Sequence, residues 1–151
     1  MSQTTTALLA RFGLAQYPVR ETGNTVLFAV SAEELPTVIR NLKHEHRLPL
    51  KTVTATDERK EKGAFRIYYV FGVPATLHSQ RGELEENIFL VPFLSVDRDT
   101  KTFPSLTPLD QEFSVYEQEI KTFFGLSPVG HPQAKRISCM KKTTKPRCTL
   151  F

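Results

Sequence analysis

The chain has 151 residues, of which 40% are hydrophobic and 24% are charged, and its formal net charge is +4. This length and composition fit one globular domain, and no apolar run approaches the roughly 20 residues that a transmembrane helix needs. The first residues lack the basic segment and the small-residue cleavage site of a secretory signal, so we expect a cytoplasmic protein.

The positive charge is concentrated at the C-terminus. Residues 131–151 contain six lysines and arginines and no aspartate or glutamate, so the rest of the chain has a net charge of −2. A domain that binds nucleic acid needs a basic face on its folded body, and this distribution argues against one. An RNA- or anion-binding module that uses the basic tail is our alternative interpretation.

The N-terminal part predicts a helix, a strand and a second helix. Residues 4–12 have the apolar spacing of a helix, and Gly13 can adopt the left-handed conformation that ends one. Residues 25–30 are β-branched and apolar, which predicts a strand buried on both faces. After a Ser31–Glu34 capping box, apolar residues recur every three or four positions and predict a helix to about residue 46.

Three more strands are expected in the middle of the chain. Apolar residues alternate with polar ones in residues 50–57 and 65–73, and a charged loop ending in Gly63 joins the two segments as a hairpin. Residues 88–96 form a third apolar run. Its Pro92 cannot donate a hydrogen bond, which predicts a bulge or an edge position.

A last helix is predicted over residues 110–124, with Gly125 as its C-terminal cap and Pro128 preventing its continuation. The whole pattern predicts an α+β fold. We expect a two-layer domain over residues 1–125, with helices packed on a mixed, largely antiparallel sheet of about four to five strands. Residues 126–151 are expected to form an extended C-terminal arm and basic tail.

Residues that could carry chemistry are scattered. Cys139 and Cys148 are too few for an iron–sulfur cluster, which usually takes four protein ligands. Free thiols are favoured over a tail disulfide or a shared metal site. His44 and His46 diverge on a helix, and the single glycines form no phosphate-binding loop. We therefore predict no catalytic, cofactor-binding or metal-binding residue in this chain.

Two patterns have both a structural and a functional interpretation. Glu117 and Glu119 diverge on the last predicted helix, so one can face solvent while the other faces a neighbouring group, which argues against acid–base catalysis. Residues 62–69 partly resemble an RNA-recognition octamer, but Ala64 and Arg66 stand where that pattern has base-stacking aromatic residues. A strand with alternate residues in the core is the simpler interpretation.

The most specific pattern consists of the segments Ser105–Pro108, Tyr116–Leu126, Gly130–Pro132 and Lys135–Ile137. In this order they resemble the signature of the 30 kDa subunit family of NADH-quinone oxidoreductases, and the resemblance spans residues 23–137. In that signature an E-R-E helix leads into a Phe-Gly turn, a Gly-His-Pro motif and a basic-aliphatic ending. The chain looks most similar to the version in formate hydrogenlyase-type complexes of the membrane-bound (group 4) nickel-iron hydrogenases.

Two positions depart from the signature of this family. Gln118 stands where the pattern has arginine between the glutamates, and Thr122 stands where it usually has aspartate. Partner contacts that the family makes through those two charges therefore do not carry over to this chain.

The resemblance implies a non-catalytic assembly subunit that docks on a large catalytic subunit, together with a small iron–sulfur subunit. Iron–sulfur clusters, quinone or a nickel-iron centre would belong to those partners, and this chain would bind no cofactor and no nucleic acid. The complex would hold it in the cytoplasm at the inner face of the membrane. The docking residues that the resemblance implies are Glu117, Glu119, Phe124, Gly125, His131, Pro132, Lys135 and Arg136.

The segment Gly125–Ile137 is the predicted partner-facing arm. An extended segment rich in proline and glycine cannot satisfy its own backbone hydrogen bonds, so we expect it to lie along another protein. An arm that folds back on its own core, through Leu126 and Val129, is the alternative.

Overall fold

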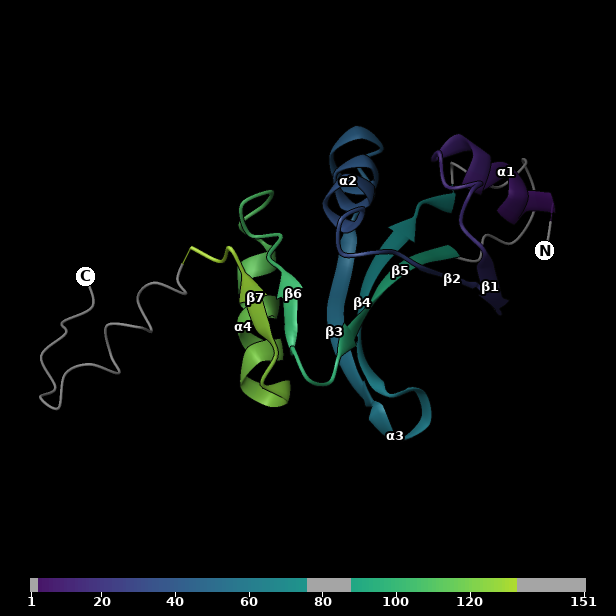
Figure 1. Cartoon of the computed structure of the whole chain (residues 1–151). Helices are drawn as coiled ribbons and strands as arrows, with labels where there is room; N and C mark the ends of the chain where they lie inside the picture. Colours follow the sequence, from purple (N-terminus) through teal and green to yellow (C-terminus); the bar gives the residue numbers. More distant parts are fainter. Residues whose placement is uncertain (1–2, 76–87, 133–151) are drawn as a thin grey trace, which may run out of the picture.

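The computed structural model describes residues 3–75 and 88–132, and predictions for residues 133–151, including both cysteines, lie outside this range (Figure 1). The helices are α1 (Gln3–Arg11), α2 (Leu35–Arg40), α3 (Arg59–Lys62) and α4 (Phe113–Phe124), and a π-helical segment η1 (Asn41–Glu45) follows α2. The strands are β1 (Val19–Thr22), β2 (Thr25–Ala29), β3 (Leu50–Glu58), β4 (Ala64–Val73), β5 (Ile88–Asp97), β6 (Thr102–Pro104) and β7 (Ser127–Val129).

The main sheet has five strands in the order β1-β2-β5-β4-β3. The β2–β5 pair is parallel, and the other neighbouring pairs are antiparallel. Strands β6 and β7 form a separate parallel pair, which stands with α4 beside β3 (Figure 1). The predicted α+β fold with a mixed, largely antiparallel sheet is confirmed.

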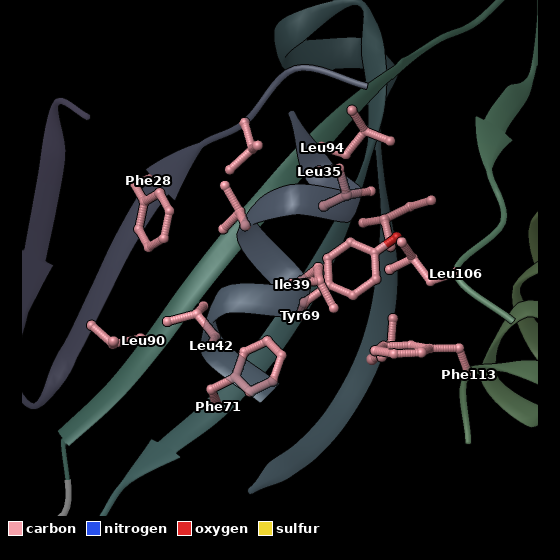
Figure 2. Close-up of a cluster of buried hydrophobic side chains, with 14 of the residues drawn as sticks. Phe28, Leu35, Ile39, Leu42, Tyr69, Phe71, Leu90, Leu94, Leu106 and Phe113 are labelled. Carbon is pink, nitrogen blue, oxygen red and sulfur yellow. The ribbon is translucent and has the colours of Figure 1, made fainter. Parts of the chain in front are cut away.

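The hydrophobic core lies between one face of the sheet and the helices α1, α2 and α4. We call this face of the sheet the core face and the opposite one the outer face. Alternate residues of β4 are buried on the core face, as the sequence predicted: Phe65, Ile67, Tyr69 and Phe71. Side chains of α2 and η1 pack against them (Figure 2). From α4, the Phe113 ring meets Tyr69 edge-on at 6.3 Å.

The second helix begins at Leu35, later than the capping box predicts, and its geometry changes after Arg40. The backbone N–H of Ser31 donates to Glu34 Oε2 at 3.4 Å, and the N–H of Glu34 donates to Ser31 Oγ at 3.3 Å. These reciprocal bonds have the capping-box pattern, but they close the turn before the helix, whose N-cap residue is Glu34. The π-helical turn η1 was not predicted. Its Asn41 donates a side-chain hydrogen bond of 2.7 Å to the carbonyl of Phe12, which fixes the end of α1.

Strand β2 was predicted to be buried on both faces, and this was wrong. Val26 and Phe28 are buried on the core face, whereas Leu27 is half-buried and Ala29 is exposed on the outer face. The three longer helices pack on the core face alone, so the outer face of the strand lacks their cover.

Pro92 was predicted to mark a bulge or an edge strand, and this was also wrong. Strand β5 lies between β2 and β4 inside the sheet. The β4–β5 ladder pairs Tyr68 with Phe93 and Phe71 with Leu90 in the same register, with a gap between them opposite Pro92. The missing amide donor of the proline therefore interrupts the ladder locally without shifting it.

The structure contains three short strands that the sequence did not predict. Strand β1 forms a hairpin with β2 around Gly23, whose φ of +60° is readily adopted by glycine. Strands β6 and β7 have three residues each, too few to show an alternating pattern.

The first part of the predicted arm folds back on the domain. Leu126 is fully buried, the N–H of Ser127 donates to the carbonyl of Lys101 at 2.8 Å, and the N–H of Ser105 donates to the carbonyl of Val129 at 2.9 Å. These backbone groups are satisfied within the chain, which corrects the expectation that they need another protein. Val129, which the alternative placed in the core, is exposed.

Candidate functional site

Helix α4 carries the most specific part of the sequence pattern and has two distinct faces. Its buried residues are Phe113, Ser114, Glu117 and Ile120. Its exposed residues are Val115, Gln118, Glu119, Thr122 and Phe123. The helix ends at Gly125, whose φ of +67° and N–H bond to the carbonyl of Lys121 form the predicted C-terminal cap.

Glu117 is a buried carboxylate that holds the segment before α4. Only 3% of the residue is exposed. Its oxygens accept hydrogen bonds from the hydroxyl of Ser105 at 2.6 Å, the backbone N–H of Leu106 at 2.6 Å and the hydroxyl of Thr107 at 2.9 Å. A buried charge is tolerated when several donors replace its water, and these three donors do so. Glu117 therefore fixes the path of residues 105–107 across the helix.

His131 closes the same cluster from the other side. Its Nε2 atom lies 3.2 Å from Ser114 Oγ and 3.8 Å from Glu117 Oε2, and the residue is 5% exposed. A serine, a histidine and a glutamate thus meet, a combination that the sequence did not predict. In a hydrolytic triad the hydroxyl and the carboxylate address different ring nitrogens, whereas here both face Nε2. Burial also shields this cluster from any substrate, so the arrangement is suited to a structural role.

The charge of Glu117 affects a neighbouring tyrosine. Burial raises the pKa of the Tyr69 hydroxyl well above its usual range, and the nearby carboxylate of Glu117 raises it further. Tyr69 therefore stays neutral in the core, where it packs against Phe113 of α4.

Lys43, a residue of η1, holds the start of α4 in place. Its ammonium group pairs with Glu112 and lies 3.5 Å from Asp110 Oδ2. Burial alone would lower the pKa of Lys43, but its hydrogen bond to Glu112 and the charge of Asp110 raise it. The same ammonium lies 5.9 Å from the centre of the Phe113 ring. These contacts set the orientation of the helix on the core.

Three large hydrophobic side chains are exposed among the described residues, and all three belong to α4 or β7. They are Val115 at 63%, Phe123 at 77% and Val129 at 62% exposure. Exposed apolar groups gathered in one unit are typical of a protein-binding surface. We call the exposed residues of α4 together with Val129 the α4 surface.

Of the residues that the resemblance implied for docking, some lie at the surface, some are buried, and some lie outside the described residues. Glu119 and Pro132 are exposed, Phe124 is half-buried, and Gly125 is the helix cap. Glu117 and His131 are buried inside the chain, so any effect they have on a partner is indirect. Lys135 and Arg136 lie outside the described residues. Docking through these residues stays a prediction.

Sequence reasoning missed the partners of Glu117 and the exposed Val115. It did indicate that Glu117 and Glu119 diverge, and the first is indeed buried while the second faces solvent. The donors come from a loop 10 to 12 residues earlier, so no sequence pattern close to Glu117 predicts them.

Neither a metal site nor a membrane span is evident in residues 3–75 and 88–132. This part of the chain has no group of three or more histidine, cysteine, aspartate or glutamate side chains that could hold a metal ion. None of its helices combines the length and the apolar character needed to cross a membrane.

Residues 28–147 match the family described as "Respiratory-chain NADH dehydrogenase, 30 Kd subunit". The chain is 31% identical over 118 residues to Hydrogenase-4 component G of Escherichia coli (strain K12), which covers 78% of this chain and 20% of that protein. It is 28% identical over 122 residues to the C subunit of the NADH-quinone oxidoreductase of Moorella thermoacetica, with 80% of this chain and 75% of that protein covered.

Formate hydrogenlyase subunit 5 of Escherichia coli (strain K12) is, like Hydrogenase-4 component G, a relative much longer than this chain. It is 26% identical over 117 residues, which cover 78% of this chain and 19% of that protein. The chain thus spans about a fifth of the length of these two hydrogenase relatives.

Two solved structures share the fold. A trypsin-resistant fragment of Nqo5 matches with a TM-score of 0.61 at 18% identity, covering 86% of this chain and 98% of the fragment. A chain of a membrane-bound sulfane sulfur reductase, described as an archaeal respiratory membrane complex, matches with a TM-score of 0.66 at 19% identity. That match covers 87% of this chain and 74% of the other.

The resemblance read from the last helix and the Gly-His-Pro motif is therefore confirmed at the level of the family. A match over residues 28–147 takes in strands β3, β4 and β5 of the main sheet as well as α4. The chain belongs to the family of the 30 kDa subunit of respiratory-chain NADH dehydrogenase.

Proposed function

We propose that this chain is a non-catalytic assembly subunit of a membrane-bound redox complex and that it docks on the large catalytic subunit through the α4 surface. The observation that carries the proposal is the exposure of Val115, Phe123 and Val129 in one unit of the fold. The relatives bear the names of subunits or components of hydrogenases and of an NADH-quinone oxidoreductase, which supports membership of such an assembly.

The lengths of the relatives support docking on a larger protein. In the two hydrogenase relatives the matched segment is about a fifth of one polypeptide. Where two domains of one chain pack together, the interface between them resembles one between separate proteins. In this protein the corresponding interface would form between this chain and a separate large subunit. A small iron–sulfur subunit would be a further neighbour.

The two departures from the family signature suit an apolar contact. Gln118 and Thr122 are both exposed on α4, between Val115 and Phe123. The hydroxyl of Thr122 donates to the carbonyl of Gln118 at 2.8 Å, which turns this polar group towards its own helix. Neutral residues at these positions reduce the cost of removing the surface from water. The matching surface of the partner should accordingly be apolar and weakly charged.

Iron–sulfur, quinone or nickel-iron chemistry belongs to the partners in this proposal. Its support is the chemistry of the described side chains: the polar cluster of α4 is buried and engaged in holding the loop before the helix. The complex would keep the chain in the cytoplasm at the inner face of the membrane.

Hydroxyl-radical footprinting tests the docking surface. Phe123 should be oxidised readily in the isolated chain, and in the assembled complex its rate should fall towards that of buried Phe113 on the same helix. Tyr17 is half-buried just before β1, at the edge of the sheet opposite β3 and α4, and serves as the internal control. Equal oxidation of Phe123 in the isolated and assembled states would refute docking through α4.

A further inference from the structure

A hollow of about 750 Å³ lies on the outer face of the main sheet, opposite the helices. Its lining runs from β1 across β2 and β5 to β4, with Lys62 contributed by α3. The size falls within the roughly 300–1,000 Å³ that is typical of binding pockets. It is separate from α4 and β7, which contribute none of its lining.

The charged residues in the lining are all basic. They are Arg20 on β1, Lys62 on α3 and Arg66 on β4, and the other lining residues are uncharged. Arg20 is exposed and forms no ion pair with a described carboxylate. Lys62 and Arg66 share one carboxylate, Glu58, at 3.0 and 3.4 Å. The hollow therefore has an excess of positive charge, which favours an anionic ligand.

The floor of the hollow is apolar and held in place. The guanidinium of Arg66 lies 4.6 Å from the centre of the Phe93 ring, and the Tyr68 ring lies 5.6 Å from it at an angle of 40°. The hydroxyl of Tyr68 donates to Glu58 at 2.6 Å. Leu27 of β2 completes the apolar part. A ligand with both carboxylates and apolar side chains would match this surface.

These contacts argue against a nucleic acid as the ligand. Base stacking needs open aromatic faces, whereas Arg66 covers the Phe93 ring and Tyr68 is tied to Glu58. A peptide needs no stacking surface: its carboxylates can reach Arg20 and Arg66, on strands at opposite sides of the hollow, while an apolar side chain rests on Leu27.

We infer that this hollow binds an extended acidic segment of a neighbouring polypeptide in the assembly, with carboxylates at Arg20 and Arg66 and an apolar side chain on Leu27. This inference rests on the proposed function, because the neighbouring polypeptide is another subunit of the complex. It adds a second interface, on the face of the sheet that the long helices leave open.

Photo-crosslinking in the native host tests this interface with the full-length chain. A benzoylphenylalanine at Ala29, which is exposed in the hollow, should crosslink to a peptide with more acidic than basic residues. Arg20→Glu should lower the crosslink yield at least about fivefold, and Arg20→Lys should retain it. Arg40→Glu, on the exposed side of α2, is the matched control and should leave the yield unchanged.

Two further crosslinker positions separate the possible outcomes. Thr52 is exposed on β3 outside the hollow and gives the background, while Phe123 reports on the α4 surface. A yield at Ala29 no higher than at Thr52, a partner peptide that is not acidic, or a crosslink to nucleic acid would overturn the inference. Crosslinks at Phe123 without any at Ala29 would leave the proposed function standing, whereas their absence at both positions would refute both proposals.

Discussion

Glu117 links three parts of the chain that are distant in sequence. Its carboxylate receives hydrogen bonds from residues 105–107, faces His131, and projects from the middle of α4. The family signature at this position therefore has a physical explanation within the subunit: a buried acid holds the segment before α4 in place. Glu119, two residues later, points into solvent and is available to a partner.

Replacing Glu117 with glutamine should destabilise the fold. The amide keeps the volume of the side chain but offers one acceptor oxygen in place of two, and its NH₂ group meets donors. We expect a loss of about 2 kcal/mol in the free energy of unfolding, measured by urea titration at pH 7. Glu119→Gln, on the exposed face of the same helix, should change it by less than about 0.5 kcal/mol. Equal effects of the two substitutions would contradict this role.

Gly125 permits a second test at the level of a single residue. Its φ of +67° is costly for residues with a Cβ atom, although no heavy atom lies within 4 Å of where that Cβ would stand. Gly125→Ala should therefore lower the unfolding free energy by about 1 kcal/mol through backbone strain alone. Gly125→Asn should lose less, because asparagine tolerates this conformation better. Thermal unfolding measures both, and an alanine variant as stable as the wild type would refute the strain.

Among the elements, the β3–β4 hairpin contains the carboxylate, Glu58, through which low pH should most clearly reduce the stability of the fold. Burial would raise the pKa of Glu58, but hydrogen bonds from Tyr68, Lys62 and Thr56 and the charge of Arg66 lower it to about 2 from a usual value of 4.5. Because folding lowers this pKa, the unfolded chain binds the proton more readily. The stabilisation is present above pH 4.5 and is lost as the pH falls towards 2.

The variant Glu58→Gln should remove this contribution. We expect it to lose about 1 kcal/mol of unfolding free energy at pH 7 and to show a flatter decline in stability between pH 4.5 and 2 than the wild type. Glu61→Gln, an exposed carboxylate in the same hairpin, should follow the wild-type curve. Urea titrations over this pH range provide the comparison, and parallel curves for wild type and Glu58→Gln would exclude the hairpin as the source.

The long elements were predictable from sequence because their patterns are periodic over many residues. Alternation marked β3 and β4, and the glycines at 13, 63 and 125 marked turns that do adopt positive φ. Strands β6 and β7 are too short to show a period, and the π-helical turn η1 has five residues with Leu42 alone buried, so no spacing distinguishes it from an α-helix. Pro92 was misleading because the sheet tolerates a local gap in its ladder.

The candidate site was predictable in position but only partly in geometry. Sequence pointed to α4 and the Gly-His-Pro motif, and the structure brings Glu117 and His131 together there. Which glutamate turns inwards depends on donors from the loop before the helix, and the buried face of α4 is set by contacts such as that of Phe113 with Tyr69. Those are long-range contacts, which single-sequence periodicity does not encode.

At the scale of the whole molecule, the sheet separates two surfaces of different chemistry. The α4 surface is apolar and weakly charged, whereas the hollow on the outer face is basic. A subunit with two such surfaces can hold two neighbours without using its core, and electrostatic complementarity would keep them distinct. Membership of the family supports the proposed role in assembly, and these two surfaces are the proposed sites of contact with neighbouring subunits.

Docking through α4 can be measured as the affinity of this chain for the large subunit of its own complex. Phe123→Ala should weaken binding at least about tenfold, as removal of an aromatic anchor from the centre of an interface does. Arg40→Ala, exposed on α2, should bind within about twofold of the wild type. If Phe123→Ala binds the large subunit as tightly as the wild-type chain, α4 is not the docking surface and the proposed function loses its structural basis.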